Sequence, residues 1–190
     1  DVHGSGPDVG EAMVTHPDID IISFTGSNDV GRQVAAKCGA QLKKVSLEMG
    51  GKNAVIVMDD ADLDLAADGI IWSAFGTSGQ RCTACSRVIV HEDVQQQLEK
   101  RLLQKMEHLR IGNGLDESVQ VGPIINEAGL EKIKKYIEIG KNEGAVLLAG
   151  GRPLTGGMFE NGHYFEPTIF TNVTSDMRIA QEEIFGPVVS

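Results

Sequence analysis

The chain has 190 residues, enough for one domain with a substantial hydrophobic core or for parts of two. Its formal net charge of -10, with a sequence pI of about 4.9, argues against a surface that binds nucleic acid or an anionic membrane. No apolar run approaches the roughly 18 residues that a membrane span needs, and no signal-peptide pattern occurs. The three cysteines, an odd number, fit a reducing compartment better than a disulfide framework. We therefore expect a cytoplasmic protein, and an organelle matrix is equally allowed if a transit segment was lost.

The first fifty residues predict half of a βαβ unit. The expected elements are a helix over 8–15, a strand over 19–25, a helix over 27–38 and a second strand over 42–47. Pro17 closes the first helix, because the residue before a proline is pushed out of the helical region. Ser27 is the expected N-cap of the second helix, and Gly39 is expected to stop it.

The turn from Gly26 to Gly31 has the composition of a phosphate-binding turn. The N–H groups at a helix N-terminus attract an anion, and Gly26 lets the backbone approach it closely. No Lys-Ser or Lys-Thr follows Gly31, so the turn is not a P-loop. A G-x-x-x-x-G spacing is also typical of an ordinary helix capped by Ser27, and the residues alone favour that interpretation.

Residues 53–90 predict a strand, a helix, a loop and a strand. The strand is expected over 53–58, and the helix over 62–75 begins in an acidic cluster that suits a helix N-terminus. Glycines at 76 and 79 end that helix, and the β-branched run at 87–90 predicts a buried strand. The stretch GTSGQRCTACSR (76–87) is therefore a short connection between two rigid elements.

Cys82, in the middle of this connection, is a candidate nucleophile. The thiolate is the reactive form of cysteine, and loop N–H dipoles or a positive partner such as Arg81 favour it. Most unpaired cysteines are buried small hydrophobes, so the residue type alone favours a structural role. Cys82 and Cys85 also form a C-x-x-C, which is typical of redox pairs and of half zinc sites. No second C-x-x-C exists and the five histidines lack ligand spacing, so we expect no metal site.

The remaining stretches predict architecture without chemistry. The expected elements are helices over 93–109 and 126–141, strands over 145–148 and 164–170, and a loop over 181–187. Gly112 is expected to end the first of these helices, and Trp72, the only tryptophan, is expected to pack against other residues.

Five motifs resemble the aldehyde dehydrogenase superfamily in order and approximate spacing. They are FTGSNDVG (24–31), LEMGGK (47–52), DDADLD (59–64), GQRCTA (79–84) and EEIFGPV (182–188), and the resemblance covers nearly the whole chain. It implies an α/β fold, with part of a Rossmann-like parallel sheet followed by an α/β catalytic domain. Residues 1–50 would be the C-terminal part of the dinucleotide-binding domain, and residues 51–190 a catalytic domain that is incomplete at its C-terminus. We therefore expect the chain to be a fragment.

The same resemblance assigns the catalytic residues. Cys82 is similar to the family's nucleophile, and Glu48 to the general base that activates a water molecule. The family's oxyanion is held by a backbone N–H near the cysteine and by an asparagine that lies upstream of this chain. Relatives that pass the acyl group to coenzyme A lack a glutamate at the base position, so Glu48 favours hydrolysis to a free acid.

The resemblance also assigns a cofactor site. It places Gly26, Ser27, Gly31 and Met49 beside the dinucleotide, Glu183 on the nicotinamide-side ribose and Phe185 near the nicotinamide. NAD is the expected cofactor, and NADP remains open because the residues that decide between them lie upstream. The full-length protein is expected to be a homodimer or homotetramer.

The function implied is NAD(P)-dependent oxidation of an aldehyde to a carboxylic acid through a cysteine thiohemiacetal and thioester. Two alternatives stay open: a thiol esterase-type hydrolase, which needs only Cys82 and Glu48, and a non-catalytic fragment of the same fold. Arg81 beside the nucleophile fits a carboxylate-bearing semialdehyde, and it fits equally well as a brace of the loop. The isolated 190 residues are expected to have little or no dehydrogenase activity.

Overall fold

The computed structural model describes all 190 residues. Its backbone divides into two compact units, Asp1–Gly50 and Gly51–Ser190, and each unit is described by itself. No helix combines the length and the apolar character that crossing a membrane requires.

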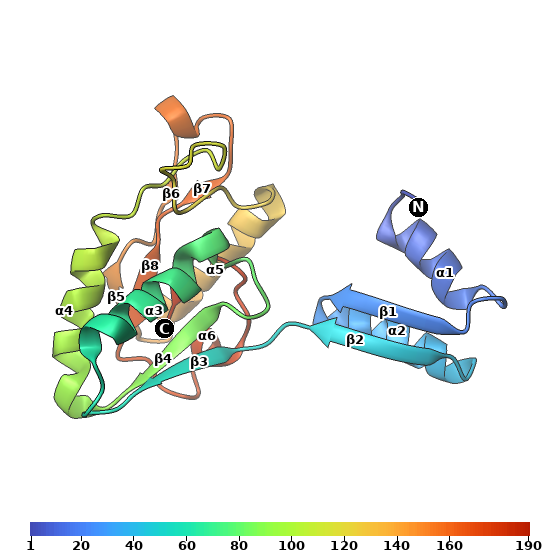
Figure 1. Cartoon of the computed structure of the whole chain (residues 1–190), viewed down its shortest axis with the longest axis horizontal. Helices are drawn as coiled ribbons and strands as arrows, with labels where there is room; N and C mark the ends of the chain where they lie inside the picture. The colour runs from blue at the N-terminus through green and yellow to red at the C-terminus, as the bar shows by residue number, and fades with distance from the viewer. The chain divides into compact units, whose positions relative to one another are not determined.

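The first unit is a strand–helix–strand crossover preceded by a short helix (Figure 1). Its elements are a π-helical turn at Gly6–Gly10, α1 (Glu11–Thr15), β1 (Ile21–Gly26), α2 (Asn28–Ala40) and β2 (Lys44–Met49). β1 and β2 pair in parallel, with Ile22 opposite Val45. Its core is small and consists of Val14, Ile22, Val34 and Cys38. The crossover predicted from the sequence is therefore present.

The ends of α2 bear out one local prediction and correct another. Ser27 caps the helix as predicted, because its Oγ accepts a hydrogen bond from the Val30 N–H at 3.3 Å. The prediction that Gly39 stops the helix was wrong, since α2 continues to Ala40. The turn that follows is made instead by Leu42, whose φ is +57°.

The second unit is built on a mixed sheet. Its strands are β3 (Asn53–Val57), β4 (Cys85–Val90), β5 (Val146–Ala149), β8 (Thr168–Thr171) and β9 (Val188–Val189). β3 and β4 are parallel, β8 and β9 are parallel, and β5 runs antiparallel to β8. Ser190, directly after β9, accepts a hydrogen bond from the Val88 N–H and donates one to the Ser86 carbonyl. These bonds place the parallel pair β3-β4 beside the three-stranded sheet β5-β8-β9, with β4 next to β9 in one layer.

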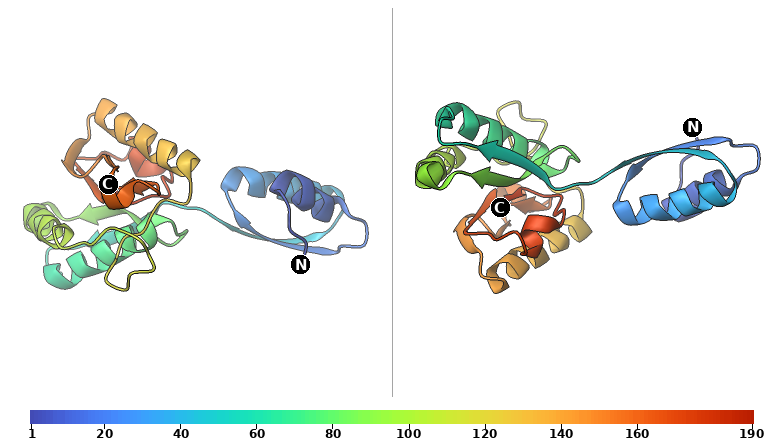
Figure 2. Two further views of the ribbon diagram at one scale, coloured as in Figure 1. Left: turned by 90° about the horizontal axis from the view of Figure 1, so that it is seen from above. Right: turned by 90° about the horizontal axis from the view of Figure 1, so that it is seen from below.

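Helices cover both faces of this layer. α3 (Leu63–Phe75) and α4 (Gln95–Met106) lie on one face and α5 (Glu127–Asn142) on the other (Figure 2). Successive strand residues point to opposite faces. Accordingly, Ile169 joins the core beneath α3 and α4, whereas Phe170 joins the core beneath α5. The expected α/β fold class is confirmed.

Shorter elements complete the second unit. They are 3-10 turns at Gly76–Gly79, Glu92–Val94 and Gly157–Phe159, the strands β6 (Pro153–Leu154) and β7 (Tyr164–Phe165), and α6 (Arg178–Gln181). Asp62 caps α3, with its carboxylate accepting from the Asp64 and Leu65 N–H groups, as the acidic cluster predicted.

Three expectations for this unit were wrong. The strand predicted over 164–170 is broken at Pro167, which has no N–H to donate, and the pieces pair with different partners as β7 and β8. α4 ends at Met106, well before Gly112. Trp72, which was expected to pack, is 68% exposed on α3.

Candidate active site

The connection between α3 and β4 has an unusual backbone. Thr77 and Ser78 have φ values of +53° and +55°, and Gly79 has +67°, in a region that only glycine enters without cost. Ser78 is buried, and its Oγ donates to the Gly122 carbonyl at 2.7 Å. Strained conformations of this kind persist only where the surroundings hold them. The loop before Cys82 is thus anchored to the rest of the second unit.

The side chain of Gln80 provides a second anchor. Its Nε2 donates to the Pro123 carbonyl at 3.1 Å, and its Oε1 accepts from the Ile125 N–H at 2.9 Å. A carboxamide satisfied at both ends is fixed in orientation as well as in position. Gln80, two residues before Cys82, is therefore fixed to the backbone of a segment about 45 residues later in the chain.

Two glycines bring distant motifs into contact. A Cβ on Gly79 would lie 2.1 Å from the Gly186 carbonyl oxygen, and one on Gly186 would lie 2.4 Å from Ile133 Cδ1. Only residues without a side chain allow this approach. The contact sets the Cys82 loop against the segment that carries Phe185, which is 42% exposed and has a φ of +61°.

Asn53, at the start of β3, holds the loop at Cys82 itself. Its Nδ2 donates to the Cys82 carbonyl at 2.6 Å and to the Ala84 carbonyl at 3.1 Å. Sequence reasoning missed this residue. The available signal was an amide side chain at the first position of a strand that pairs with the strand following the loop, since Asn53 is opposite Cys85 in the register.

Cys82 lies exposed on this braced loop. The Ala84 N–H donates to the Arg81 carbonyl at 3.1 Å, which closes a turn around the cysteine. The N–H groups of Cys82 and Thr83 donate to no group of the chain. An exposed thiol with unpaired N–H dipoles beside it is the arrangement that a nucleophile and its oxyanion require.

Arg81, the residue before Cys82, packs on Trp72 of α3. The Arg81 guanidinium lies over the Trp72 ring, with its carbon 4.5 Å from the ring centroid, and donates to the Ser73 carbonyl at 3.3 Å. Both residues line a pocket of about 540 Å³ that also includes Gly76 and Thr77. Arg81 has no carboxylate partner, and its buried Nε has no hydrogen-bond acceptor.

The three thiols differ sharply in environment. Cys82 is exposed, whereas Cys38 and Cys85 are buried. Burial raises the pKa of the Cys85 thiol to about 11, and hydrogen bonding and Lys52 oppose this only in part. Cys85 is therefore a neutral, weakly nucleophilic thiol at physiological pH. No group of three or more His, Cys, Asp or Glu side chains is arranged to hold a metal ion.

Lys52 is a buried cation next to this region. Burial, with the Arg87 charge adding to it, lowers the pKa of Lys52 to about 8, while Cys85 and Glu183 act in the opposite direction. Its Nζ has no hydrogen-bond partner.

In the first unit, the predicted dinucleotide residues form a continuous group. Gly26 ends β1, Ser27 caps α2, and the N–H groups of Asn28 and Asp29 donate to no group of the chain. Gly31 packs on Met49, because a Cβ there would lie 2.4 Å from the Met49 Sδ. Unpaired N–H groups at a helix N-terminus favour an anion such as a phosphate.

Glu48 is exposed at the end of β2, opposite Thr25 in the register. Since strand side chains alternate, its carboxylate and the Met49 thioether lie on opposite faces of the ribbon. Glu48 belongs to the first unit and Cys82 to the second. Their cooperation in catalysis stays a prediction.

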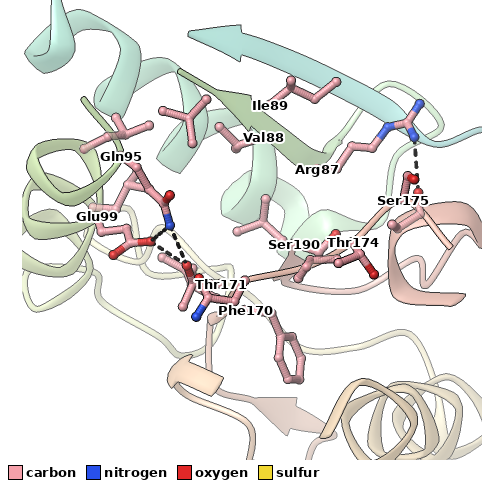
Figure 3. Close-up of a pocket in the computed structure, with 18 residues that line it drawn as sticks. Arg87, Val88, Ile89, Gln95, Glu99, Phe170, Thr171, Thr174, Ser175 and Ser190 are labelled. Carbon is pink, nitrogen blue, oxygen red and sulfur yellow. Dashed lines mark hydrogen bonds between the residues drawn. The ribbon is translucent and has the colours of Figure 1, made fainter. Parts of the chain in front are cut away.

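A separate groove of about 360 Å³ lies between β4, β8 and α4 (Figure 3). Several of its polar groups bind one another: Thr171 Oγ1 and Gln95 Nε2 both donate to Glu99 Oε1. Arg87 donates through Nη1 to the Ala180 carbonyl at 3.2 Å, while its buried Nε has no acceptor. None of the predicted site residues lines this groove. The Cys82 loop is the better candidate because its polar groups are held but not paired.

Comparison with known proteins places this geometry in a family. The model of the aldehyde dehydrogenase family matches residues 2–190. The α-ketoglutaric semialdehyde dehydrogenase of Bacillus subtilis is 49% identical over 189 residues, covering 100% of this chain and 39% of that protein. The betaine aldehyde dehydrogenase of Brucella anthropi is 46% identical, with 100% and 39% covered.

Solved structures agree with the sequence comparison. Betaine aldehyde dehydrogenase from Staphylococcus aureus, in complex with NAD+, has a TM-score of 0.95 at 37% identity, covering 99% of this chain and 37% of that one. An NAD-dependent aldehyde dehydrogenase from Sinorhizobium meliloti has a TM-score of 0.95 at 41% identity, with 99% and 37% covered. The chain spans about two fifths of the length of these relatives. It belongs to the aldehyde dehydrogenase family.

Proposed function

We propose that the protein carrying this chain oxidises an aldehyde to a carboxylic acid with NAD, using Cys82 as its nucleophile. The observation that carries the proposal is the Cys82 loop: an exposed thiol on an anchored backbone, with two unpaired N–H groups, in a chain of the aldehyde dehydrogenase family. Cys85 and Cys38 do not compete for this role because both are buried.

In the first step, the Cys82 thiolate attacks the aldehyde carbon. A carbon–sulfur bond forms, and the carbonyl π electrons move to the oxygen as an oxyanion. The N–H groups of Cys82 and Thr83 are the donors of this chain that suit that oxyanion, because no other acceptor occupies them. Covalent attachment divides one difficult reaction into two easier ones.

The residues present fit a dinucleotide. The unpaired N–H groups of Asn28 and Asp29 suit its phosphates. Because Gly31 has no side chain, α2 can pack closely on Met49 of β2. Glu183 and Phe185 are the residues we assign to its nicotinamide end. When bound, NAD supplies the acceptor for the hydride whose departure converts the thiohemiacetal to a thioester.

In the last step, Glu48 acts as general base. Its carboxylate takes a proton from water as the water oxygen bonds to the thioester carbon. The carbon–sulfur bond then breaks, Cys82 leaves as thiolate, and the carboxylic acid is released. A residue in this role makes hydrolysis, rather than transfer to another thiol, the outcome.

Arg81 supports a substrate that bears a carboxylate. Its guanidinium lines a pocket with Trp72, Gly76 and Thr77, lies over the Trp72 ring and has no anionic partner within the chain. A carboxylate on the far end of the substrate would form an ion pair with the Arg81 guanidinium, whereas a quaternary ammonium group would be repelled by it. The relative from Bacillus subtilis is named for a semialdehyde of the first kind.

The homodimer or homotetramer we propose rests on family membership alone, and the cytoplasmic location rests on the odd number of cysteines, which fits a reducing compartment. The rival function is a thiol hydrolase that needs no dinucleotide. It predicts ester turnover that is unchanged by NAD, and the isolated chain of 190 residues would then keep its activity.

The test is NADH formation by the full-length protein with a panel of aldehydes, measured for wild type, Cys82→Ser and Cys85→Ser. We expect aldehyde-dependent NADH formation in wild type, its loss in Cys82→Ser, and near wild-type rates in Cys85→Ser, the matched control three residues away. Full activity in Cys82→Ser would overturn the proposal. The same assay with NADP in place of NAD shows which of the two cofactors the protein uses.

A further inference from the structure

The bond pattern of Asn53 is unlike that of any other side chain near Cys82. One amide nitrogen donates to two carbonyls of the same loop, those of Cys82 and Ala84, which lie on either side of Thr83. Asn53 begins β3 and pairs with Cys85 of β4, with a register shift between Asn53 and Ala54, after which the two strands pair regularly. The Asn53 side chain therefore fixes the position of the Cys82 loop relative to β3.

This clamp determines where the neighbouring N–H groups point. In a trans peptide the carbonyl and the N–H of the same unit point in opposite directions. Because the Cys82 carbonyl is held toward Asn53, the Thr83 N–H points away from it. The Arg81 carbonyl is likewise held by the Ala84 N–H, so the Cys82 N–H points away from that bond.

The bonds also polarise the peptide that carries the unpaired donor. A carbonyl that accepts a hydrogen bond strengthens the N–H of its own peptide unit as a donor, as in any chain of linked hydrogen bonds. The bond from Asn53 to the Cys82 carbonyl is short, at 2.6 Å. A stronger Thr83 N–H stabilises negative charge on the nearby sulfur or on an oxyanion.

We propose that Asn53 is a positioning residue for the Cys82 nucleophile: its amide clamps the Cys82 and Ala84 carbonyls and thereby orients and strengthens the unpaired Thr83 N–H next to Cys82. The inference rests on the proposed function of Cys82. Asn53 touches the loop backbone and neither the thiol nor the reacting atoms, so it acts through the peptide groups and is no catalytic residue itself.

The chain offers a matched control on the same backbone. Ser86 Oγ donates to the Asn53 carbonyl at 3.2 Å, on the opposite end of the same residue. Ser86→Ala removes a bond to Asn53 but leaves its side-chain amide on the loop. Asn53→Ala removes both donors to the loop, and Asn53→Asp replaces them with carboxylate oxygens that face two carbonyls.

The experiment is site-resolved alkylation of the chain by iodoacetamide between pH 6 and 10, read by mass spectrometry of the Cys82, Cys85 and Cys38 peptides. In Asn53→Ala we expect Cys82 alkylation at pH 7 to slow about tenfold, with its half-maximal rate moved about one pH unit upward. Asn53→Asp should slow it further, Asn53→Ser should lie between Ala and wild type, and Ser86→Ala should stay within about twofold of wild type.

The outcomes separate the clamp from the proposed function and from misfolding. Protection of Cys38 and Cys85 shows that a variant keeps its fold, and if Asn53→Ala loses it, the milder Asn53→Ser carries the comparison. Equal Cys82 rates and pH profiles in wild type and the folded Asn53 variants overturn the clamp. A wild-type Cys82 that reacts no faster than a thiol in an unstructured peptide contradicts the proposed function instead, and the Asn53 variants still show whether the clamp sets its rate.

Discussion

Two segments of the second unit, residues 76–84 and 178–182, differ in how their polar groups are paired. In the second segment, Glu182 accepts from the Arg178 guanidinium at 3.0 and 2.9 Å and from the Tyr136 hydroxyl at 2.6 Å. In the first, the carbonyls around Cys82 are held while its N–H groups donate to nothing. Polar groups that are fully paired indicate a structural role, and groups that are fixed but unpaired indicate a site for a reacting molecule.

The largest effect on activity should come from removing the Cys82 thiol, which lies next to the unpaired N–H groups of the first segment. Cys82→Ser is expected to lower kcat for aldehyde oxidation at least about a thousandfold, because the hydroxyl is a far weaker nucleophile than a thiolate. Thermal unfolding should be nearly unchanged, since Cys82 is exposed and its side chain makes no hydrogen bond. Steady-state kinetics and a melting curve on the same preparation check both halves. A variant that unfolds early would assign Cys82 a structural role instead.

The next effect tests whether the first segment is truly fixed. Gly79→Ala should lower the free energy of unfolding by about 3 kcal/mol, because the new Cβ meets the Gly186 carbonyl and the backbone has a positive φ. Urea denaturation measures this change. Gly114→Ala is the control, since a Cβ there meets nothing within 4 Å. Equal stability of the two variants would show that the loop is not anchored at Gly186.

A smaller, selective effect is expected at Arg81. Arg81→Gln should raise KM about tenfold for aldehydes that carry a distal carboxylate and leave KM for neutral aldehydes of similar length within about twofold. The comparison between substrates is essential, because loss of the Trp72 contact alone would affect all of them alike. An equal change for both classes would identify Arg81 as a brace of the loop.

The smallest effect concerns the paired segment. Glu182→Gln should lower the free energy of unfolding by about 1 kcal/mol or less, since the carboxylate is 41% exposed and solvent screens its ion pair with Arg178. Hydrogen bonds from Arg178 and Tyr136 lower the pKa of Glu182 from 4.5 to about 2. A carboxyl with a lowered folded-state pKa stabilises the fold above its unfolded value and loses that contribution as pH falls.

Acid titration of stability measures this contribution. Wild type should lose it between about pH 5 and pH 2, and Glu182→Gln should show a flatter profile over the same interval. Aldehyde oxidation near neutral pH should not change in this variant. A large loss of activity with unchanged stability would mean that the paired segment also takes part in the chemistry.

Local signals in the sequence predicted local structure well. Ser27 was identified as a helix cap, and the acidic cluster that contains Asp62 was identified as a helix N-terminus, because these signals depend only on residues a few positions ahead. Gly39 failed as a stop signal because a helix ends where its continuation ceases to pack, which the sequence around it does not reveal. Pro167 was overlooked inside a β-branched run, although its missing N–H divides the strand.

The site was predicted only in its reacting residues. Cys82 stood out through its glycine-rich surroundings and the family motifs, but its supports come from distant parts of the chain. The Asn53 clamp and the Gly79–Gly186 contact depend on how strands and loops meet, and no spacing along the sequence encodes them. Trp72 was expected to pack against other residues, whereas in the structure it is largely exposed and the Arg81 guanidinium lies over its ring.

The most direct test of the account is to trap the acyl group on the enzyme. The full-length protein is mixed with an aldehyde and NAD, quenched in acid within its first turnover, digested and mapped by mass spectrometry. We predict that the acyl mass is found on Cys82 and not on Cys38 or Cys85. The acyl adduct on Cys82 should accumulate to a higher level in Glu48→Gln. Product formation with no acyl adduct on Cys82 in either protein, or an adduct on a different residue, would contradict the central role of this cysteine.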